Sequence, residues 1–194
     1  MATLFDGIDD KLRAFIEAQP MFFVGSAPSG SDGLVNISPK GYRDSFAILD
    51  ERTVAYLDLF GSGVETIAHL KQNGRIVIMF CSFDRNSRIV RLHGHGSVLR
   101  PDDPRFRELA PHFNLQHPGL RSMILIDVER VADSCGYAVP YMNVVDERPV
   151  LDKVQGTRTA EDWAERVAGV NAKSLDGLPG LDPDHPLPTS VPRD

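Results

Sequence analysis

The chain has 194 residues, of which 42% are hydrophobic and 25% are charged, and its formal net charge is −6 at pH 7. These proportions are typical of a globular protein and exclude a collagen or a coiled coil. Its 2 cysteines make no disulfide framework, and no apolar run approaches the roughly 18 residues that span a bilayer. The acidic balance argues against nucleic acid or an anionic membrane as a partner. The first residues carry acids and lack the apolar segment of a signal peptide, so we expect a soluble cytoplasmic domain.

The first quarter of the chain predicts one helix and the start of a sheet. Residues 6–19 carry apolar side chains at helical spacing. Asp6 or Asp9 can cap this helix, and Pro20 ends it. After it, short apolar runs rich in β-forming residues alternate with turn-forming segments, which predicts antiparallel hairpins. The strands expected from these runs are 21–27, 34–37, 45–49 and 53–57.

The middle of the chain predicts a second helix among further strands. Gly61-Ser62-Gly63 leads into a helical pattern over 64–73, and Gly74 is a typical stop signal. Six or seven antiparallel strands with one helix among them are too many for a βαβ protein and favour a closed or split barrel. The further strands expected are 75–82, 87–99 and 123–131, with a short helix over 105–112.

The regular patterns weaken after the last expected strand. We therefore divide the chain into a barrel domain, 1–135, and a C-terminal extension, 136–194, that packs on the barrel. One helix is expected in the extension, over 159–169, and it starts with a sequence like that of a capping box. The proline-rich end, 178–194, is expected to run extended over the surface or to be loose.

The glycine-rich junction at Gly61-Ser62-Gly63 is the first candidate binding segment. It follows a strand and opens a helix, where free backbone N–H groups and the helix dipole attract an anion such as phosphate. It is neither a Walker loop nor a dinucleotide fingerprint, because the required lysine and third glycine are missing. A purely structural interpretation stays open, because Ser62 and Glu65 have capping-box spacing.

A second candidate segment, 35–41, ends a strand in a turn that proline stiffens. It presents Asn36 and Ser38, whose side chains can hydrogen-bond a ring or a ribityl chain, and Lys40, which can neutralise a phosphate. The alternative is a plain strand-to-loop exit with a solvated lysine.

Neither the histidines nor the cysteines identify a metal or catalytic site. Arg91, His93 and His95 alternate along one strand and share a face, but no further ligands accompany the two histidines at metal-binding spacing. A polar face at a barrel mouth or a dimer interface is the better interpretation. Cys81 and Cys135 have no positioned base and are taken as incidental thiols. No metal site is expected.

The order of these segments resembles the pyridoxamine 5′-phosphate oxidase-like, FMN-binding split-barrel superfamily over roughly residues 10–132. The segments that carry the resemblance are 22–27, 35–41, 54–58, 61–63, 73–76 and 92–98. The segments 134–140 and 174–180 look like an uncharacterised branch rather than the oxidase itself.

This resemblance implies a mainly β fold, a six-stranded antiparallel split barrel with peripheral helices. It also implies a homodimer with one FMN in each of two clefts at the subunit interface. Arg88 and Val90 would reach the cofactor from the other subunit. The cofactor-binding residues implied in all are Asn36, Ile37, Ser38, Pro39, Lys40, Tyr56, Leu57, Ser62, Gly63, Glu65, Thr66, Arg88 and Val90.

The sequence departs from the family pattern at the phosphate site. The oxidase proper has a Ser-Arg-Lys cluster there, whereas residues 62–65 contain no base. Glu65 beside a phosphate is unfavourable unless its carboxylate turns away. Lys40, Arg43 or Arg88 would have to supply the positive charge. The C-terminal Trp and Arg-x-His substrate motif of the oxidase is also absent, so vitamin B6 oxidation is not expected.

Three functions stay open at this point. The leading one is an FMN-dependent oxidoreductase of unassigned small-molecule substrate, with electrons from NADH, NADPH or a reduced deazaflavin. Tyr56, His93 and His95 are candidates for proton transfer that the sequence does not distinguish, so the catalytic residues are unknown. The alternative is a non-catalytic protein of the same fold that binds flavin, deazaflavin or haem. The third is a dimeric barrel without a cofactor, whose tail contacts other proteins.

Overall fold

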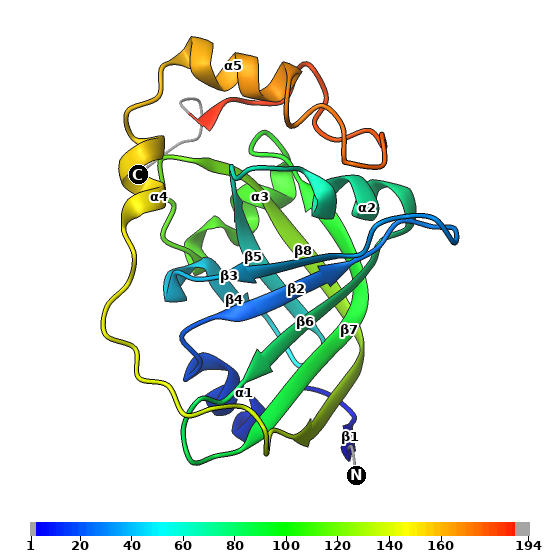
Figure 1. Ribbon diagram of the computed structural model, residues 1–194, viewed down its shortest axis with the longest axis vertical. Coiled ribbons are helices and arrows are strands. Elements are labelled where there is room, and N and C mark those ends of the chain that lie inside the picture. Colours follow the sequence, from blue (N-terminus) through cyan, green and yellow to red (C-terminus); the bar gives the residue numbers. More distant parts are fainter. Residues whose placement is uncertain (1–2, 189–194) are drawn as a thin grey trace.

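Eight strands form one antiparallel sheet in the computed structural model, which describes residues 3–188 (Figure 1). The strands are β1 (Thr3–Phe5), β2 (Phe22–Ser26), β3 (Asn36–Lys40), β4 (Phe46–Ile48), β5 (Thr53–Leu59), β6 (Arg75–Cys81), β7 (Arg88–Leu99) and β8 (Leu120–Cys135). Their order across the sheet is β3-β2-β6-β7-β8-β5-β4, and β1 pairs with β8. The predicted fold class, a mainly β split barrel, is confirmed, with eight strands in place of six.

Helices lie at both ends of the curled sheet. They are α1 (Asp10–Glu17), α2 (Glu65–Asn73), α3 (Pro104–Leu109), α4 (Val150–Gln155) and α5 (Ala160–Ala168), with short 3-10 helices η1 (Arg43–Ser45) and η2 (Ala110–His112). A long linker runs along one side of the molecule from the end of β8 to α4, and α5 then crosses the end where α2 begins (Figure 1). Within residues 3–188, no helix has the length and apolarity needed to cross a membrane.

Aromatic contacts across the interior show how strongly the sheet curls. Phe22 lies on β2 and Phe46 on β4, near opposite ends of the strand order, yet their ring centroids are 5.1 Å apart. Phe46 also contacts Phe80 of β6 at 5.1 Å. The inward residues of every long strand join this one core. The alternation of buried and exposed positions that predicted the strands is therefore the pattern of a barrel interior.

The helix ends follow the predicted signals in part. The side chain of Asp9 caps α1 by accepting a hydrogen bond from Leu12 N at 2.7 Å, so the helix begins at Asp10 and not at Asp6. Gly74 ends α2 in the left-handed conformation at φ 73°, which confirms the predicted stop. The expected helix over 105–112 is α3 followed by the tighter turn of η2.

Two strands differ from their expected bounds. The strand expected over 34–37 begins instead at Asn36, because Leu34 N donates to the carboxylate of Asp176 at 3.1 Å and not to a neighbouring strand. It continues through Pro39, and β3 is an edge strand, where a proline is tolerated. The strand expected over 123–131 extends to Leu120–Cys135, because β7 pairs with it along nearly its whole length.

A close approach of two backbones occurs in the middle of β7, as its glycines predicted. A Cβ added at Gly94 would lie 2.0 Å from Asp127 O, so no larger residue fits there without movement. The register between β7 and β8 shifts between His93 and Gly94, which marks an irregularity of the bulge type.

The C-terminal segment contacts the barrel through both helices and the tail. The capping box predicted at the start of α5 is confirmed, since Thr159 and Asp162 each bond the other's backbone N–H. Trp163 of α5 is buried, and the centroid of its ring lies 4.9 Å from that of Phe60. Residues 178–188 lie against the barrel, with His185 buried. The remainder of the expected loose tail, 189–194, lies outside the described residues.

Candidate functional site

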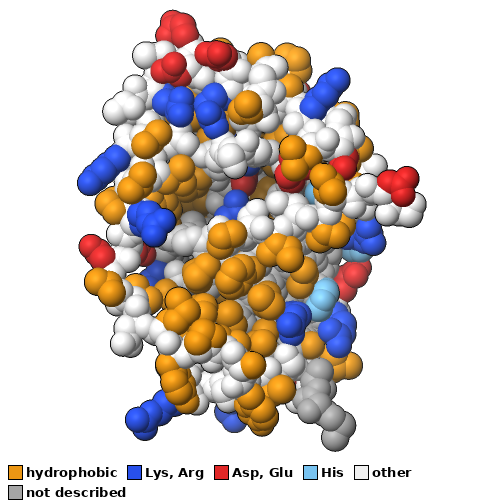
Figure 2. Space-filling view, viewed as in Figure 1, with side chains coloured by type: hydrophobic (Ala, Val, Ile, Leu, Met, Phe, Trp, Pro, Cys, Tyr) orange, Lys and Arg blue, Asp and Glu red, His pale blue; other side chains and the backbone are white. Residues whose placement is uncertain are grey.

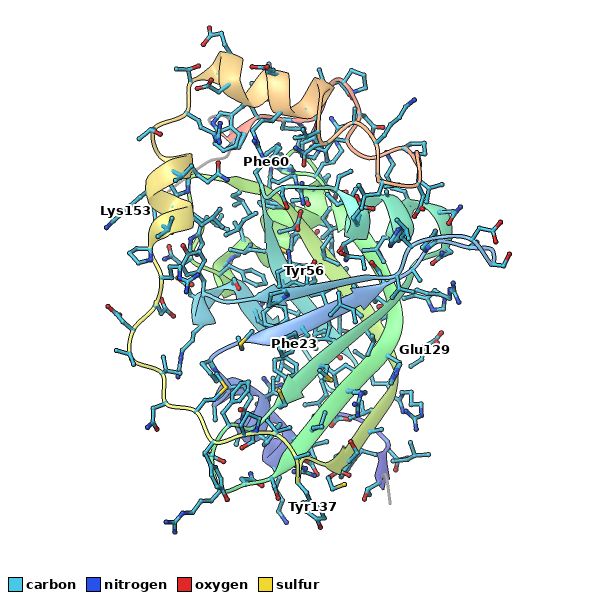
Figure 3. The ribbon with its side chains drawn as sticks, viewed as in Figure 1. Phe23, Tyr56, Phe60, Glu129, Tyr137 and Lys153 are labelled. Carbon is cyan, nitrogen blue, oxygen red and sulfur yellow. The ribbon has the colours of Figure 1, made fainter. Side chains whose placement is uncertain are left out.

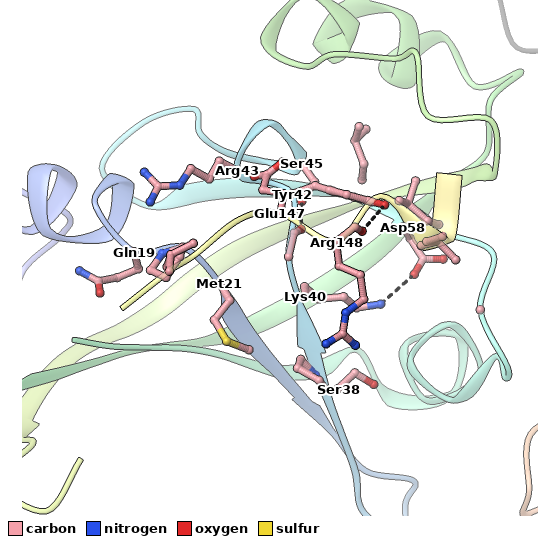
Figure 4. A pocket seen from close by; sticks show the side chains of 18 of the residues that line it. Gln19, Met21, Ser38, Lys40, Tyr42, Arg43, Ser45, Asp58, Glu147 and Arg148 are labelled. Carbon is pink, nitrogen blue, oxygen red and sulfur yellow. Dashed lines mark hydrogen bonds and ion pairs between the residues drawn. The ribbon is translucent and has the colours of Figure 1, made fainter. Parts of the chain in front are cut away.

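A pocket of about 1040 Å³ lies at the end of the barrel where β3, β5 and the start of α2 meet (Figure 4). One wall is β3, and a second is the segment that connects β5 to α2. The linker segment 142–148 forms a third wall. The pocket therefore brings together segments that are far apart in the sequence, including one from the C-terminal extension.

Most of the residues predicted to bind a cofactor line this one pocket. They come from both candidate segments, the strand with its proline turn and the glycine-rich junction. The predicted residues found here are Asn36, Ser38, Pro39, Lys40, Leu57, Ser62, Gly63, Glu65 and Thr66. Arg43, one of the suggested sources of positive charge, lines it too.

The other predicted residues lie elsewhere in the chain. Ile37 is on β3 but is 69% exposed and faces outward. Tyr56 is fully buried inside the barrel (Figure 3). Val90 is fully buried as well. Arg88 forms an ion pair with Asp133, from Nη2 to Oδ2 at 2.5 Å. Reaching a cofactor from another subunit therefore stays a prediction for Arg88 and Val90.

A buried carboxylate organises the positive charge of the pocket. Asp58, at 0% exposure, accepts a hydrogen bond from Arg121 Nε to its Oδ2 at 2.7 Å. Lys40 Nζ approaches the other oxygen, Oδ1, at 3.6 Å (Figure 4). Ser122 Oγ donates to Oδ2 at 3.3 Å. Two cations against one carboxylate leave this wall of the pocket with a net positive charge.

The pKa of Asp58 reflects the same arrangement. Burial alone would raise it, because a charged carboxylate is costly away from water. The charges of Arg121 and Lys40, with the hydrogen bonds from Arg121 and Ser122, outweigh burial and hold the pKa of Asp58 below its usual value. Asp58 is therefore ionised at neutral pH, and it keeps Arg121 in place beside the pocket.

Arg121 joins the barrel to the glycine-rich junction. Its Nη1 donates to Gly63 O at 3.1 Å and to Asn171 Oδ1 at 2.5 Å. Within residues 3–188, its Nη2 forms no hydrogen bond, although Arg121 lines the pocket. Arg166 from α5 donates to the carbonyl oxygen of Gly61 in the same junction. The junction is thus held by two guanidinium groups that the local sequence does not contain.

The start of α2 is open toward the pocket. Val64 occupies the N-cap position and makes no side-chain capping bond, so the alternative interpretation, a capping box between Ser62 and Glu65, does not hold. The carboxylate of Glu65 instead accepts from Leu175 N, at 3.1 Å and 3.2 Å. Within residues 3–188, the first N–H groups of α2 therefore have no side-chain partner, and such groups with the helix dipole attract an anion.

Short polar side chains of β2, β3 and α2 form a connected network beside this helix start. Asn36 Nδ2 donates to Thr66 Oγ1 at 3.2 Å, and Ser38 Oγ donates to Asn36 Oδ1 at 3.3 Å. Ser26 Oγ lies 3.0 Å from Nδ1 of His69, a fully buried imidazole. Burial lowers the pKa of His69, although Glu65 and Asp176 act against this.

Tyr42 shapes the mouth of the pocket through an unusual backbone conformation. Its φ is 60°, and among residues 3–188 no other non-glycine residue has a positive φ. Its ring stacks on His117 with centroids 4.7 Å apart, and its hydroxyl donates to Arg148 O at 3.3 Å. His117 is itself held between Asp152 and Asp44. The conformation of Tyr42 thus ties the linker to the rim of the pocket.

Comparison with known families decides the identity of this fold and pocket. The family described as pyridoxamine 5′-phosphate oxidase matches residues 8–135, which contain strands β2 to β8 and all the pocket-lining residues except the linker residues 142–148 and Leu151. The chain belongs to the pyridoxamine 5′-phosphate oxidase family. A curated relative, the pyridoxamine 5′-phosphate oxidase family protein ustO of Aspergillus flavus, is 40% identical over 93% of this chain and 78% of its own length. The likeness therefore extends into the C-terminal extension.

Solved structures similar to this family member share the fold at low sequence identity. A single-residue variant of HupZ from Group A Streptococcus is 20% identical and matches with a TM-score of 0.50, over 66% of this chain and 99% of its own. A Lactobacillus delbrueckii protein provisionally named a pyridoxamine 5′-phosphate oxidase is 18% identical, with a TM-score of 0.51 over 66% and 94% of the two chains. Both matches concern the fold, and each covers about two thirds of this chain.

Sequence reasoning missed several pocket residues that lie outside the two candidate segments. Arg121, Tyr42 and Arg148 line the pocket but belong to no local motif. One signal was present for Arg121, which interrupts an otherwise apolar strand at Leu120-Arg121-Ser122-Met123. A charged residue on a buried strand implies a buried partner, and Asp58 is that partner.

Proposed function

We propose that the protein is an FMN-dependent oxidoreductase with a small-molecule substrate. The observation that carries the proposal is the open start of α2 in the same pocket as Lys40 and Arg121. A helix N-terminus with two nearby cations fits the phosphate of FMN. The pocket volume, about 1040 Å³, is slightly above the usual range for small-molecule and cofactor sites, roughly 300–1,000 Å³, so the pocket has room for FMN.

In this proposal, residues outside 62–65 replace the basic cluster that the sequence lacks there. Lys40 and Arg121 supply the positive charge, and the hydroxyls of Ser62 and Thr66 lie at the helix start. The carboxylate of Glu65 is bonded to Leu175 N, so it does not cap the helix in competition with a phosphate. Glu65 still lines the pocket, so the charges of Lys40 and Arg121 have to outweigh its repulsion of a phosphate.

The rest of the pocket suits the uncharged part of the cofactor. Asn36 and Ser38 present hydrogen-bonding groups along β3, and Leu57 adds an apolar surface. FMN, when bound, supplies the two-electron redox chemistry. The residues of this chain would orient it, and the linker with Tyr42 would restrict the access of water and of substrate.

Haem, one of the alternative cofactors, receives less support from this pocket. Among residues 3–188, no histidine lines it, so it offers no imidazole to a haem iron. His93 and His95 lie on β7, and His95 pairs with Glu129. A non-catalytic flavin-binding protein remains the second candidate, because residues 62–65 lack the basic cluster of the oxidase proper.

The first test is a comparison of FMN with riboflavin, which lacks only the phosphate. The purified full chain is titrated with each compound while flavin fluorescence is recorded. We expect FMN to bind at one per chain and at least roughly tenfold more tightly than riboflavin, since charge-assisted hydrogen bonds contribute about 1.5–3 kcal/mol. Equal affinities would contradict a phosphate site at α2, and no binding of either compound would overturn the proposal.

A pair of lysine variants tests whether Lys40 supplies positive charge to the phosphate of FMN. Lys40→Gln removes the cation beside Asp58 and should weaken FMN binding more than riboflavin binding. Lys153→Gln is the matched control, because Lys153 is exposed on α4 and does not line the pocket. Oxidation of NADH or NADPH by the FMN-loaded protein then separates an oxidoreductase from a flavin-binding protein without turnover.

We further propose that the protein is a homodimer. Leu34, Val35 and Ile37 are exposed on and before the edge strand β3, and Val145 of the linker is 96% exposed. Hydrophobic side chains spread over the middle of this face of the molecule (Figure 2). Light scattering after size-exclusion chromatography measures the mass, and Ile37→Lys should shift it from dimer to monomer. A monomeric wild-type protein would contradict the dimer.

A further inference from the structure

Three potential metal ligands gather where the tail meets α2. Glu65 and His69 are four residues apart and so lie on one face of the helix. Asp176 comes from the tail loop 174–177 and reaches the same place. One ligand atom from each of these residues lies within 4.8 Å of the other two. The residues join parts of the chain more than a hundred positions apart.

His69 is the decisive member of this group. It is fully buried, at 0% exposure, and its Nε2 is also buried but makes no hydrogen bond within residues 3–188. A buried polar atom without a partner is costly. Its other nitrogen, Nδ1, lies 3.0 Å from Ser26 Oγ. We assign the proton to Nδ1, which donates to Ser26 and leaves a lone pair on Nε2, as in metal-binding histidines.

The two carboxylates are oriented but not neutralised. Glu65 accepts from Leu175 N at 3.1 Å, and Asp176 accepts from Leu34 N at 3.1 Å. Within the described part of the chain, neither forms an ion pair with a lysine or arginine. Two neighbouring carboxylates without a cation repel each other. Backbone N–H groups that hold carboxylates in this way resemble the outer shell of a metal site.

We propose that Glu65, His69 and Asp176 bind one divalent first-row transition-metal ion, such as Zn²⁺ or Mn²⁺. The ion would take the lone pair of the buried imidazole and balance the two carboxylate charges. An imidazole among the ligands disfavours Mg²⁺ and Ca²⁺, which prefer oxygen. Asp176 is exposed, so water completes the coordination from the solvent side.

The ion would join three segments that already contact one another through a few hydrogen bonds. These are α2, the tail loop 174–177 and the loop before β3, which contacts Asp176 through Leu34. The tail loop turns at Gly177, whose φ of 75° suits glycine. The predicted role is therefore structural: metal binding fixes the tail against the helix that opens the pocket.

The test is metal binding by the full chain after treatment with EDTA and dialysis. Isothermal titration with ZnCl₂, and separately with MgCl₂, gives stoichiometry and affinity without any flavin, so it is independent of the proposed function. We expect one Zn²⁺ per chain and no saturable Mg²⁺ binding. Hydrogen exchange of residues 174–177 should slow when Zn²⁺ is added. No saturable Zn²⁺ binding would overturn the proposal.

Matched variants show where a bound ion sits. His69→Gln and Asp176→Asn should each weaken Zn²⁺ binding at least roughly tenfold. Ser26→Ala removes the hydrogen-bond partner of His69 Nδ1 and should weaken Zn²⁺ binding by about 10–100-fold. His95→Gln and Asp182→Asn remove an exposed histidine and another tail acid, and should leave the affinity unchanged. Asp176→Asn lies in an exposed loop and tests the site even if the buried His69→Gln does not fold. Zn²⁺ binding that Asp176→Asn leaves intact would overturn the proposal.

Discussion

Asp58 is the residue on which the charge arrangement of the pocket depends. It is fully buried and pairs with Arg121 and Lys40 at once. We expect Asp58→Asn to destabilise the fold by about 3–5 kcal/mol, because a buried guanidinium loses its counter-charge. Urea unfolding of the variant and the wild type measures this difference. Asp182→Asn, which breaks a half-exposed pair with Lys71, should cost less than about 1 kcal/mol. Equal losses in the two variants would show that burial of the Asp58 pair adds nothing.

Single residues were predictable here only where their partners are close in sequence. Asp9 caps α1 through Leu12, three positions away, and the prediction was right. Glu65 has capping-box spacing to Ser62, but its carboxylate bonds Leu175 N, 110 positions away, so the structural alternative left open at this junction is ruled out. A local pattern cannot include a partner that only the fold supplies. Arg121 and its contacts to Asn171 and Asp58 were missed for the same reason.

The long elements were predictable because their hydrophobic patterns are complete in themselves. Strands β5, β6 and β7 fall within about two residues of their expected ends. Strand β1 was missed, since three residues carry no periodicity, and it exists only through its pairing with β8. Helix α4 has six residues and no side-chain cap, and it too was missed. Short elements of this kind form where tertiary contacts hold them.

The contribution of one helix cap to the stability of the protein can be measured at the start of α5. The side chain of Thr159 accepts from Asp162 N, and Asp162 accepts from Thr159 N at 2.8 Å. Thr159→Ala should destabilise the protein by about 1 kcal/mol, because one N–H at the helix start loses its partner. Thr159→Ser keeps the hydroxyl and should cost little. Chemical unfolding followed by the fluorescence of Trp163, the one tryptophan in the chain, reports both variants. A full loss in Thr159→Ser would mean that packing of the methyl group, and not capping, matters.

At the scale of the whole molecule, the C-terminal extension completes the pocket that the barrel begins. Gln155 Nε2 donates to Phe60 O at 2.7 Å, and Lys71 Nζ donates to Gly180 O at 2.9 Å. The linker supplies a wall of the pocket. The sequence indicated a helix and a proline-rich tail but not where they attach. The attachments combine single hydrogen bonds with the packing of Trp163 and Leu181 into the core, and the partners of these contacts lie far away in the sequence. The division into barrel and extension remains a prediction about folding units.

The attachment of the tail should depend on pH through His185. This imidazole is buried, and its Nε2–H donates to Arg121 O at 2.8 Å. Burial lowers the pKa of His185, and the charges of Arg100 and Arg121 lower it further. The hydrogen bond to Arg121 O and the charge of Asp102 raise it, but the net shift is downward. The folded pKa therefore lies below the value of about 6.5 for an unfolded histidine. The docked tail binds fewer protons than the released tail, so docking is complete above this pH and weakens as the pH falls below it.

Hydrogen exchange of residues 181–187 measures this dependence, once intrinsic exchange rates have been removed. Protection should be constant above about pH 7 and should fall below pH 6.5 by at most about tenfold per pH unit, because one proton is involved. His185→Gln keeps an N–H donor that does not titrate, so its protection should no longer change over this range. His95→Gln, at an exposed position on β7, should behave like the wild type. A variant at position 185 that kept the full pH dependence would assign the effect to another group and contradict the role of His185.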